Sequence, residues 1–177
     1  MEPRAVVAQP FATHRLRLRP LQVDDAATMA DVLGDPALHV FTGGAPLSAD
    51  DLRVRYERLV AGSPDPDVGW LNWVVRLGSA REPVGTVQAT VGRAAGPAGG
   101  LTAEIAWVVG TPWQGRGIAT EAAQALVGWL RERGIGRVVA HVHPDHTASA
   151  SVAAAAGLER TDVLNDGEVR WQRDLGP

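Results

Sequence analysis

The sequence predicts an α/β or α+β domain built on a mixed sheet, and three observations support this. Segments with the two-residue period of a strand are interspersed with segments whose apolar residues follow helical spacing. Two neighbouring strand segments are joined by a short turn, which favours antiparallel pairing. Hydrophobic residues make up 45% of the chain and charged residues 21%, the balance of an ordinary globular protein.

The expected elements of the first half are a strand over residues 14–19, helices over 24–33 and 48–61, and a hairpin of strands over 70–77 and 83–91. Arginine and leucine alternate along the first strand, which Pro20 ends. Ser48 followed by Asp51 resembles a capping box and marks the start of the second helix.

The expected elements of the second half are a strand over residues 101–109, a helix over 118–134, a strand over 138–142, a short helix over 148–156, and strands over 158–163 and 168–173. The longest helix is predicted by Ile118, Ala122 and Leu126, whose spacing places them on one face.

The chain of 177 residues fits a single domain, residues 1–177, with about residues 1–12 as a loosely ordered lead-in. Its first residues lack the apolar stretch of a signal peptide, and no apolar run approaches the roughly 20 residues that span a membrane. We therefore expect a cytoplasmic protein without a membrane partner.

Composition also excludes some kinds of chemistry. The chain has no cysteine, which rules out disulfides, thiolate metal sites and a cysteine acyl-enzyme. The net charge of −3 gives no electrostatic reason to expect a nucleic-acid partner. Residues 24–51 carry six aspartates and no arginine. These acids fit helix N-termini, and the alternative is an acidic lobe that attracts a cationic substrate.

The segment Glu104–Glu121, EIAWVVGTPWQGRGIATE, joins a strand to a helix through a glycine-rich loop. Glycines such as Gly115 and Gly117 let the backbone approach a ligand closely and adopt positive φ angles. The helix N-terminus leaves amide N–H groups unpaired and carries a partial positive charge. With Arg116 beside them, these groups predict a cradle for an anion such as a pyrophosphate. The loop lacks the Lys-Ser/Thr ending of a nucleotide P-loop, which argues against ATP or GTP hydrolysis.

Gln114-x-x-Gly117-x-Ala119 after an apolar strand resembles the acetyl-CoA pyrophosphate motif of the GCN5-related N-acetyltransferase (GNAT) family. About thirty residues later, His146-x-x-Ser149 followed by Gly157 and Leu158 resembles the second motif of that family, usually Asn-x-x-Ser and then Gly-Phe.

The start of the chain carries the same resemblance. Thr13–Pro20, THRLRLRP, with Asp25 and Ala26, is similar to the branch that acetylates ribosomal-protein N-termini (RimJ/RimL type). The resemblance covers about residues 13–175. It implies a mixed, mostly antiparallel twisted sheet of about seven strands, split by the cofactor and flanked by about four helices.

The implied activity is transfer of an acetyl group from acetyl-CoA, a co-substrate, to a primary amine on a protein N-terminus or a small molecule. Transfer is direct, in a ternary complex, without a metal, by a monomer or a homodimer. The implied cofactor contacts are Trp107, Val108 and Val109 for the pantetheine arm; Gln114, Gly115, Arg116, Gly117, Ile118, Ala119 and Thr120 for the pyrophosphate; and His146 and Ser149 near the sulfur.

Two residues are candidates for proton transfer. Glu104, an acid inside an apolar strand, is the candidate base, acting through water. Ser149 is the candidate acid or sulfur-contacting hydroxyl. The alternatives are a solvent-facing strand residue for Glu104 and a helix N-cap for Ser149. His141 and His143 alternate beside His146, but the lack of cysteine and of an acid cluster favours structural roles over a zinc site.

The sequence departs from the family pattern at two points. His146 replaces the usual Asn, and the Tyr with which many relatives protonate the departing thiolate is missing, since the only tyrosine is Tyr56. An alternative function is therefore a catalytically inactive acyl-CoA-binding sensor or interaction module. Acceptor specificity is expected in residues 35–70 and in the loop over residues 93–100.

Overall fold

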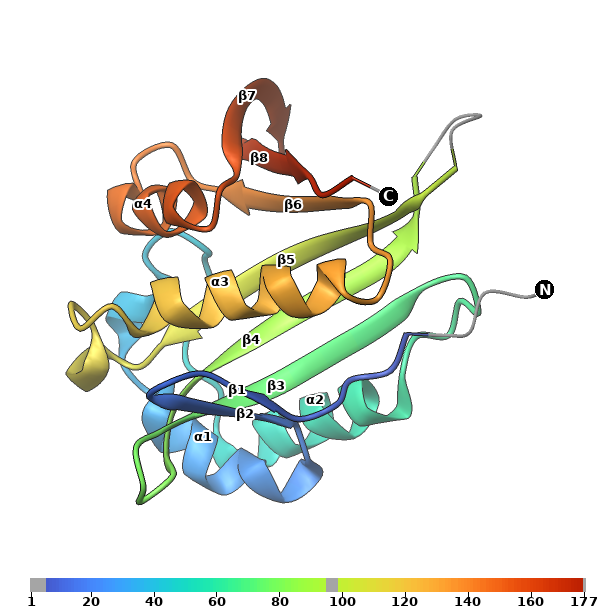
Figure 1. Ribbon diagram of the computed structural model, residues 1–177. Helices are drawn as coiled ribbons and strands as arrows, with labels where there is room; N and C mark the ends of the chain where they lie inside the picture. Colours follow the sequence, from blue (N-terminus) through green and yellow to red (C-terminus); the bar gives the residue numbers. More distant parts are fainter. Residues whose placement is uncertain (1–5, 95–98, 177) are drawn as a thin grey trace.

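The computed structural model describes residues 6–94 and 99–176, which form one eight-stranded sheet and four α-helices (Figure 1). The strands are β1 (Phe11–Ala12), β2 (Leu16–Pro20), β3 (Gly69–Leu77), β4 (Glu82–Arg93), β5 (Leu101–Val109), β6 (Arg137–Val142), β7 (Glu159–Asn165) and β8 (Glu168–Asp174). The helices are α1 (Ala26–Val32), α2 (Ala49–Ala61), α3 (Ile118–Arg131) and α4 (Thr147–Ala155).

The strand order is β1-β2-β3-β4-β5-β6-β8-β7, and every neighbouring pair is antiparallel except β5 and β6, which are parallel. The predicted class, a mixed and mostly antiparallel sheet with about four helices, is confirmed. The sheet has one strand more than the expected seven because Phe11 and Ala12 pair with Leu18 and Arg17.

The expectation of a loosely ordered lead-in is wrong for these two residues. The Phe11 ring packs on Trp73 and Trp129, with centroid distances of 5.6 and 5.8 Å. The Trp73 indole N–H donates a hydrogen bond to the Gln9 carbonyl at 2.9 Å. Burial of aromatic surface therefore orders a segment whose local sequence carries no strong strand pattern.

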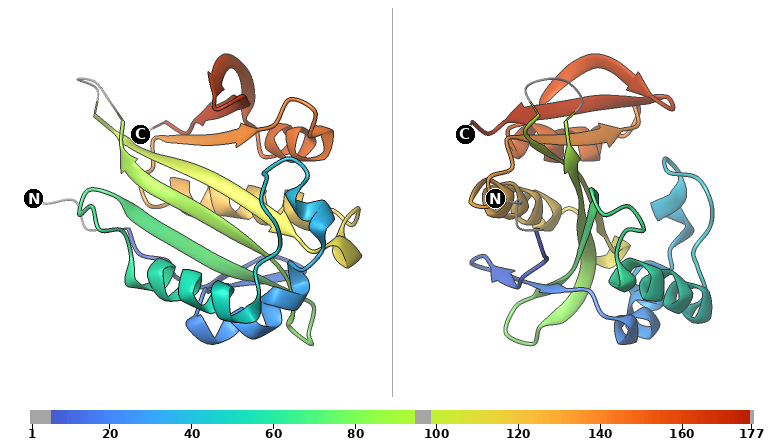
Figure 2. Two further views of the ribbon diagram at one scale, coloured as in Figure 1. Left: turned by 180° about the vertical axis from the view of Figure 1, so that it is seen from behind. Right: turned by 90° about the vertical axis from the view of Figure 1, so that its right-hand side faces the viewer.

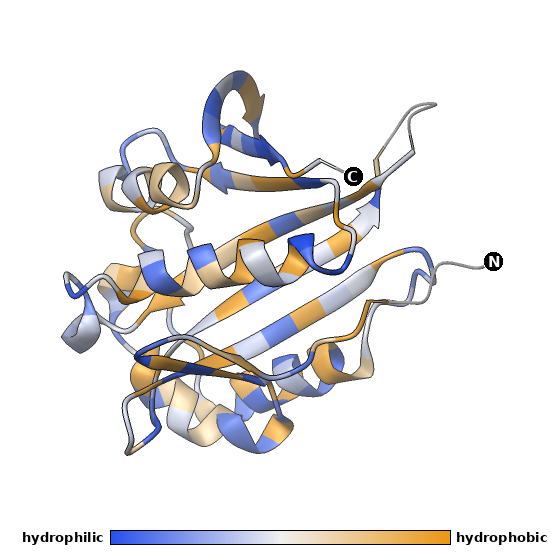
Figure 3. Cartoon of the chain, viewed as in Figure 1, coloured by the Kyte–Doolittle hydropathy of each residue, from blue (hydrophilic) through white to orange (hydrophobic). Residues whose placement is uncertain are grey.

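Helices cover both faces of the sheet (Figure 2): α3 and α4 lie on one face, and α1 and α2 on the other. The larger core lies under α3, where Trp73 and Leu126 are fully buried. A smaller core joins α1 and α2 to the opposite face through Met29, Tyr56 and Val74. Figure 3 shows the corresponding pattern as alternating hydrophilic and hydrophobic bands along β3 and β4.

Five of the six aspartates of residues 24–51 lie at helix starts, and two of them, Asp24 and Asp25, form ion pairs. The Ser48 hydroxyl accepts a hydrogen bond from the Asp51 N–H and caps α2. Asp25 pairs with Arg19 and Arg76, and Asp24 pairs with Arg53. These contacts favour the helix-start interpretation over an acidic lobe.

The two parallel strands separate after a short paired stretch. β5 pairs with β6 only through Thr102–Glu104 and Arg137–Val139. β6 stays paired with β8 along its whole length, and β5 stays paired with β4. The last five residues of β5, residues 105–109, therefore have no strand partner on the β6 side. None of the helices in the described ranges is long and apolar enough to cross a membrane.

Candidate functional site

The glycine-rich loop after β5 leads directly into the N-terminus of α3. Gly115 and Gly117 have φ angles of 72° and 74°, so both adopt the left-handed conformation that favours glycine. Gly117 is the N-cap of α3 and supplies no capping side chain. Within the described parts of the chain, no backbone N–H of residues 115–120 donates to a backbone carbonyl. These free donors and the helix dipole form a site suited to a phosphate group.

Side chains from within the loop and from outside it hold this cradle in place. The Gln114 amide donates to the Val109 carbonyl at 3.0 Å and ties the loop to the end of β5. Arg15, just before β2, donates from Nε to the Glu121 carboxylate at 2.7 Å and from Nη1 to the Arg116 carbonyl at 3.0 Å.

The Thr13 hydroxyl also donates to the Glu121 carboxylate. Partial burial raises the pKa of Glu121, but the hydrogen bonds from Thr13 and Arg15 outweigh it and hold the pKa below its usual value. Local sequence patterns carry no signal for this contact, because the partners lie more than a hundred positions apart.

The three residues expected to contact pantetheine do not all point their backbone N–H and carbonyl groups to the same side of β5. The Gly110 N–H donates to the Val84 carbonyl at 2.8 Å, and the Val108 carbonyl points at Gly85, so these groups face β4. Because backbone groups alternate sides along a strand, those of Trp107 and Val109 face the side where β6 has separated. Val108 is therefore oriented away from a ligand at that edge, contrary to the expectation from the resemblance.

Glu104 lies at the last paired position before β5 and β6 separate, and its carboxylate contacts His141 Nδ1 at 2.9 Å. The carboxylate is 56% exposed, whereas His141 is only 12% exposed. Glu104 is thus solvent-facing, as the alternative interpretation of this residue predicted. Its carboxylate is nevertheless paired with the His141 imidazole. His141 was interpreted as structural from the sequence, and its partnership with Glu104 depends on the pairing of β5 with β6.

His146 and Ser149 lie together at the N-terminus of α4. His146 is the N-cap, and its Nδ1 accepts a hydrogen bond from the Ser149 N–H at 3.3 Å. The N-cap alternative for Ser149 is therefore wrong, because the cap is three residues earlier. With Nδ1 as acceptor, the neutral ring carries its proton on Nε2, which lies 3.1 Å from Ser149 Oγ. The Ser149 hydroxyl hydrogen is then free for another acceptor.

Phe41, from the segment between α1 and α2, stacks on the His146 ring with a centroid distance of 4.4 Å. Its ring centroid lies 5.2 Å from that of His143. Burial lowers the pKa of His146, and the nearby charge of His143 lowers it further. Phe41 therefore connects the region expected to bind the acceptor with the α4 end of the site.

We expect the fold to lose stability as the pH falls below about 6.5, the ordinary imidazole value. The unfolded chain protonates His146 first, because the folded pKa is lower, so the contribution of the neutral ring is present above that pH and is lost on acidification. NMR titration of His146 should give a midpoint below 6.5, and His146→Asn should reduce the acid-induced drop in melting temperature. A midpoint at or above 6.5 would contradict the buried, capping role.

The three neighbouring histidines do not form a metal centre. In the part of the chain that the structure describes, no three His, Cys, Asp or Glu side chains are placed to hold a metal ion.

Of the loop expected to contribute to acceptor specificity, residues 95–98 lie outside the described residues.

Comparisons with known proteins agree with this geometry. No curated protein sequence matches the chain. Among solved structures, the GNAT domain of S. lividans PAT is 27% identical, with a TM-score of 0.69, and covers 93% of this chain and 96% of its own. An acetyltransferase from Agrobacterium tumefaciens is 24% identical, with a TM-score of 0.71, and 98% of each chain is covered.

A third structure, RimL, a ribosomal L7/L12 alpha-N-protein acetyltransferase in complex with coenzyme A, is 18% identical with a TM-score of 0.71 and covers 94% of this chain and 98% of its own. The model of the acetyltransferase (GNAT) domain matches residues 15–159, which is most of the chain. The chain therefore belongs to the GNAT family of acetyltransferases, which use acetyl-CoA.

Proposed function

We propose that this enzyme transfers the acetyl group of acetyl-CoA directly to a primary amine while both substrates are bound. One observation carries the proposal: β5 and β6 separate, and the gap between them is flanked by an anion cradle on one side and by the Ser149 hydroxyl on the other. The cradle follows the carboxyl end of β5, and Ser149 follows that of β6. Ligands of α/β sheets commonly bind at the carboxyl ends of diverging parallel strands.

Different parts of the proposed site bind the pyrophosphate and the pantetheine arm of the cofactor. The N–H groups of Gly115 to Thr120 hold the pyrophosphate, with Arg116 adding charge beside them. The open edge of β5 offers the N–H and carbonyl groups of Trp107 and the N–H of Val109 to the amides of the pantetheine arm, as an edge strand does to a peptide. The Val109 carbonyl already accepts the hydrogen bond from Gln114. The thioester then reaches the region between Glu104 and Ser149.

The chemical step follows from these placements. The amine nitrogen attacks the thioester carbon, a C–N bond forms, the C–S bond breaks, and the electron pair leaves on sulfur. The amine proton passes through water to the Glu104–His141 pair, in which the carboxylate orients the imidazole. Ser149 donates a hydrogen bond to the departing sulfur. A thiolate with a pKa near the ~8.5 of cysteine leaves without a strong acid, which accounts for activity without the family tyrosine.

The segment over residues 13–20 supports placement in the branch that acetylates ribosomal-protein N-termini. A terminal α-amine, with a pKa of about 7.7–8.0, is partly neutral at pH 7, whereas a lysine-like amine near 10.4 is not. The lack of a spanning helix in the described ranges fits a cytoplasmic enzyme.

We expect calorimetry to detect coenzyme A binding and a thiol-release assay to detect turnover with at least one member of a panel of primary amines. The panel should include free amino acids, amidated peptides and simple alkylamines. Tight coenzyme A binding without thiol release on any amine would contradict the proposal and favour the acyl-CoA sensor. Absence of coenzyme A binding would contradict both.

A further inference from the structure

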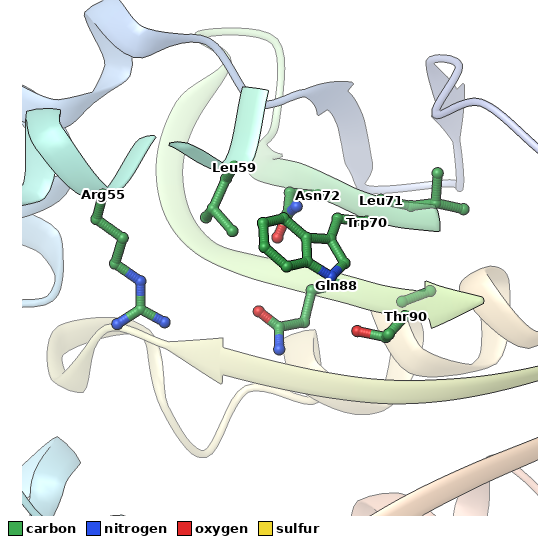
Figure 4. A pocket seen from close by; sticks show the side chains of 8 residues that line it. Arg55, Leu59, Trp70, Leu71, Asn72, Gln88 and Thr90 are labelled. Carbon is green, nitrogen blue, oxygen red and sulfur yellow. The ribbon is translucent and has the colours of Figure 1, made fainter. Parts of the chain in front are cut away.

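A pocket of about 130 Å³ lies between α2 and the sheet, on the face opposite α3. Its walls come from Arg55 and Leu59 on α2, Trp70 and Asn72 on β3, and Gln88 and Thr90 on β4; Figure 4 shows how these side chains lie around it. At the roughly 30 Å³ that one water occupies in the liquid, this volume corresponds to about four waters. Its size suits one amino-acid residue rather than a folded polymer.

The register of the sheet places this pocket beside Glu104. Trp70 pairs with Thr90, and Thr90 pairs with Glu104, across three adjacent antiparallel strands. Directly opposed residues carry their side chains on the same face. With strands about 4.8 Å apart, Thr90 lies about 5 Å and Trp70 about 10 Å from Glu104 along the sheet. An amine at Glu104 would therefore extend its substituents into the pocket over the roughly 5–10 Å between Glu104 and these two residues.

The lining is polar and cationic. Among the described residues, the side chains of Asn72, Gln88 and Thr90 make no hydrogen bond, so their donors and acceptors are available. Arg55 is exposed and forms no ion pair in the described part of the chain, whereas Arg53, two positions earlier, contacts Asp24 and Glu57 at 3.6 and 3.5 Å. No carboxylate lines the pocket.

We propose that Arg55 binds an acidic group of the acceptor, and that the acceptor is an amine carrying a carboxylate about one residue's length away. Two acceptor classes share this chemistry: a free α-amino acid and a peptide whose first residue is acidic. A guanidinium pairs with a carboxylate through charge-assisted hydrogen bonds, and the two carboxamides of Asn72 and Gln88 match the remaining polar groups. Polyamines are disfavoured, because a second ammonium group would meet Arg55 without a carboxylate to offset the repulsion.

This inference rests on the proposed acetyl transfer and is tested with matched acceptors. The thiol-release assay gives kcat/KM for phenylalanine, phenylalaninamide and phenethylamine, for amidated peptides beginning with Asp or Asn, and for spermidine. Wild-type protein should prefer the carboxylate-bearing member of at least one matched set. Preference for phenylalanine indicates a free amino acid, and preference for the Asp peptide over the Asn peptide indicates an acidic N-terminal residue.

The Arg55→Gln variant should lower kcat/KM for the preferred carboxylate acceptor by about 10- to 100-fold, the range for one charge-assisted contact. It should leave kcat/KM for phenethylamine unchanged. Arg58→Gln, an exposed arginine one turn further along α2, is the matched control and should change neither. Melting temperatures of the three proteins check that the fold is intact.

Several results would overturn the inference: an equal loss on all acceptors, no loss in Arg55→Gln, or a wild-type preference for spermidine or phenethylamine. These differ from failure of the proposed function, in which coenzyme A binds and no amine in the panel releases thiol. If phenethylamine is turned over and no acceptor depends on Arg55, the proposed acetyl transfer stands and only the proposal of an acidic acceptor is contradicted.

Discussion

The Gly117→Glu variant is expected to lose coenzyme A binding, with an affinity at least about 100-fold weaker than that of the wild type. Gly117 has a φ angle of 74°, where any side chain is strained, and it is the N-cap of the helix whose N–H groups form the cradle. An added Cβ would lie 3.5 Å from Arg15 Nη2, and the carboxylate would place a negative charge at the N-terminus of α3, where the phosphate is proposed to bind. Losing two charge-assisted hydrogen bonds of about 1.5–3 kcal/mol each accounts for a fall of this size.

Calorimetry with coenzyme A measures the effect, and Gly78→Glu is the matched control. Gly78 has a φ angle of 68° in the turn between β3 and β4, with nothing within 4 Å of an added Cβ, so it repeats the strain and the charge away from the cradle. Arg116→Ala should cost only about 1–3 kcal/mol, because backbone groups make most of the contacts. Unchanged affinity in Gly117→Glu would remove the basis for the cofactor site.

The Glu104→Gln variant is expected to lower kcat by roughly 10²–10⁴-fold, the usual contribution of one acid–base group. The amide keeps the size of the side chain and can still accept a hydrogen bond from His141, but it cannot stabilise a protonated imidazole as a carboxylate does. Coenzyme A affinity should stay unchanged, because Glu104 is not part of the cradle. The residual rate should rise with pH as solvent deprotonates the amine.

Steady-state kinetics on wild type, Glu104→Gln, His141→Gln and the double variant test whether the pair acts as a unit. The two single losses should be similar and the double loss far smaller than their product, as found for residues that share one step. A loss below about tenfold in Glu104→Gln, with the wild-type pH profile kept, would show that Glu104 is structural. Alignment of amine and thioester would then carry the rate enhancement.

Local patterns were sufficient for most elements and for the cradle. The alternation around Leu16, the Ser48 cap and the apolar spacing after Ile118 each describe contacts within a few residues, and each element formed close to its predicted position. The bounds differ by a few residues: β2 runs over Leu16–Pro20 rather than 14–19, and α3 ends at Arg131 rather than at residue 134. The loop at Gly115 and Gly117 could be identified for the same reason: its positive φ angles and its unpaired amides are consequences of the adjacent sequence.

The sequence by itself thus determined the class of the fold, the position of the glycine-rich loop before α3 and the family resemblance. Only the tertiary structure decided that Phe11 orders a strand, that Arg15 holds Glu121, and that His141 meets Glu104. Each of these depends on which elements become neighbours in space, and these neighbours are set by long-range burial rather than by local periodicity. The pocket under Arg55 also depends on the tertiary structure: α2, β3 and β4 follow one another along the chain, but they enclose a pocket only because α2 packs against the sheet.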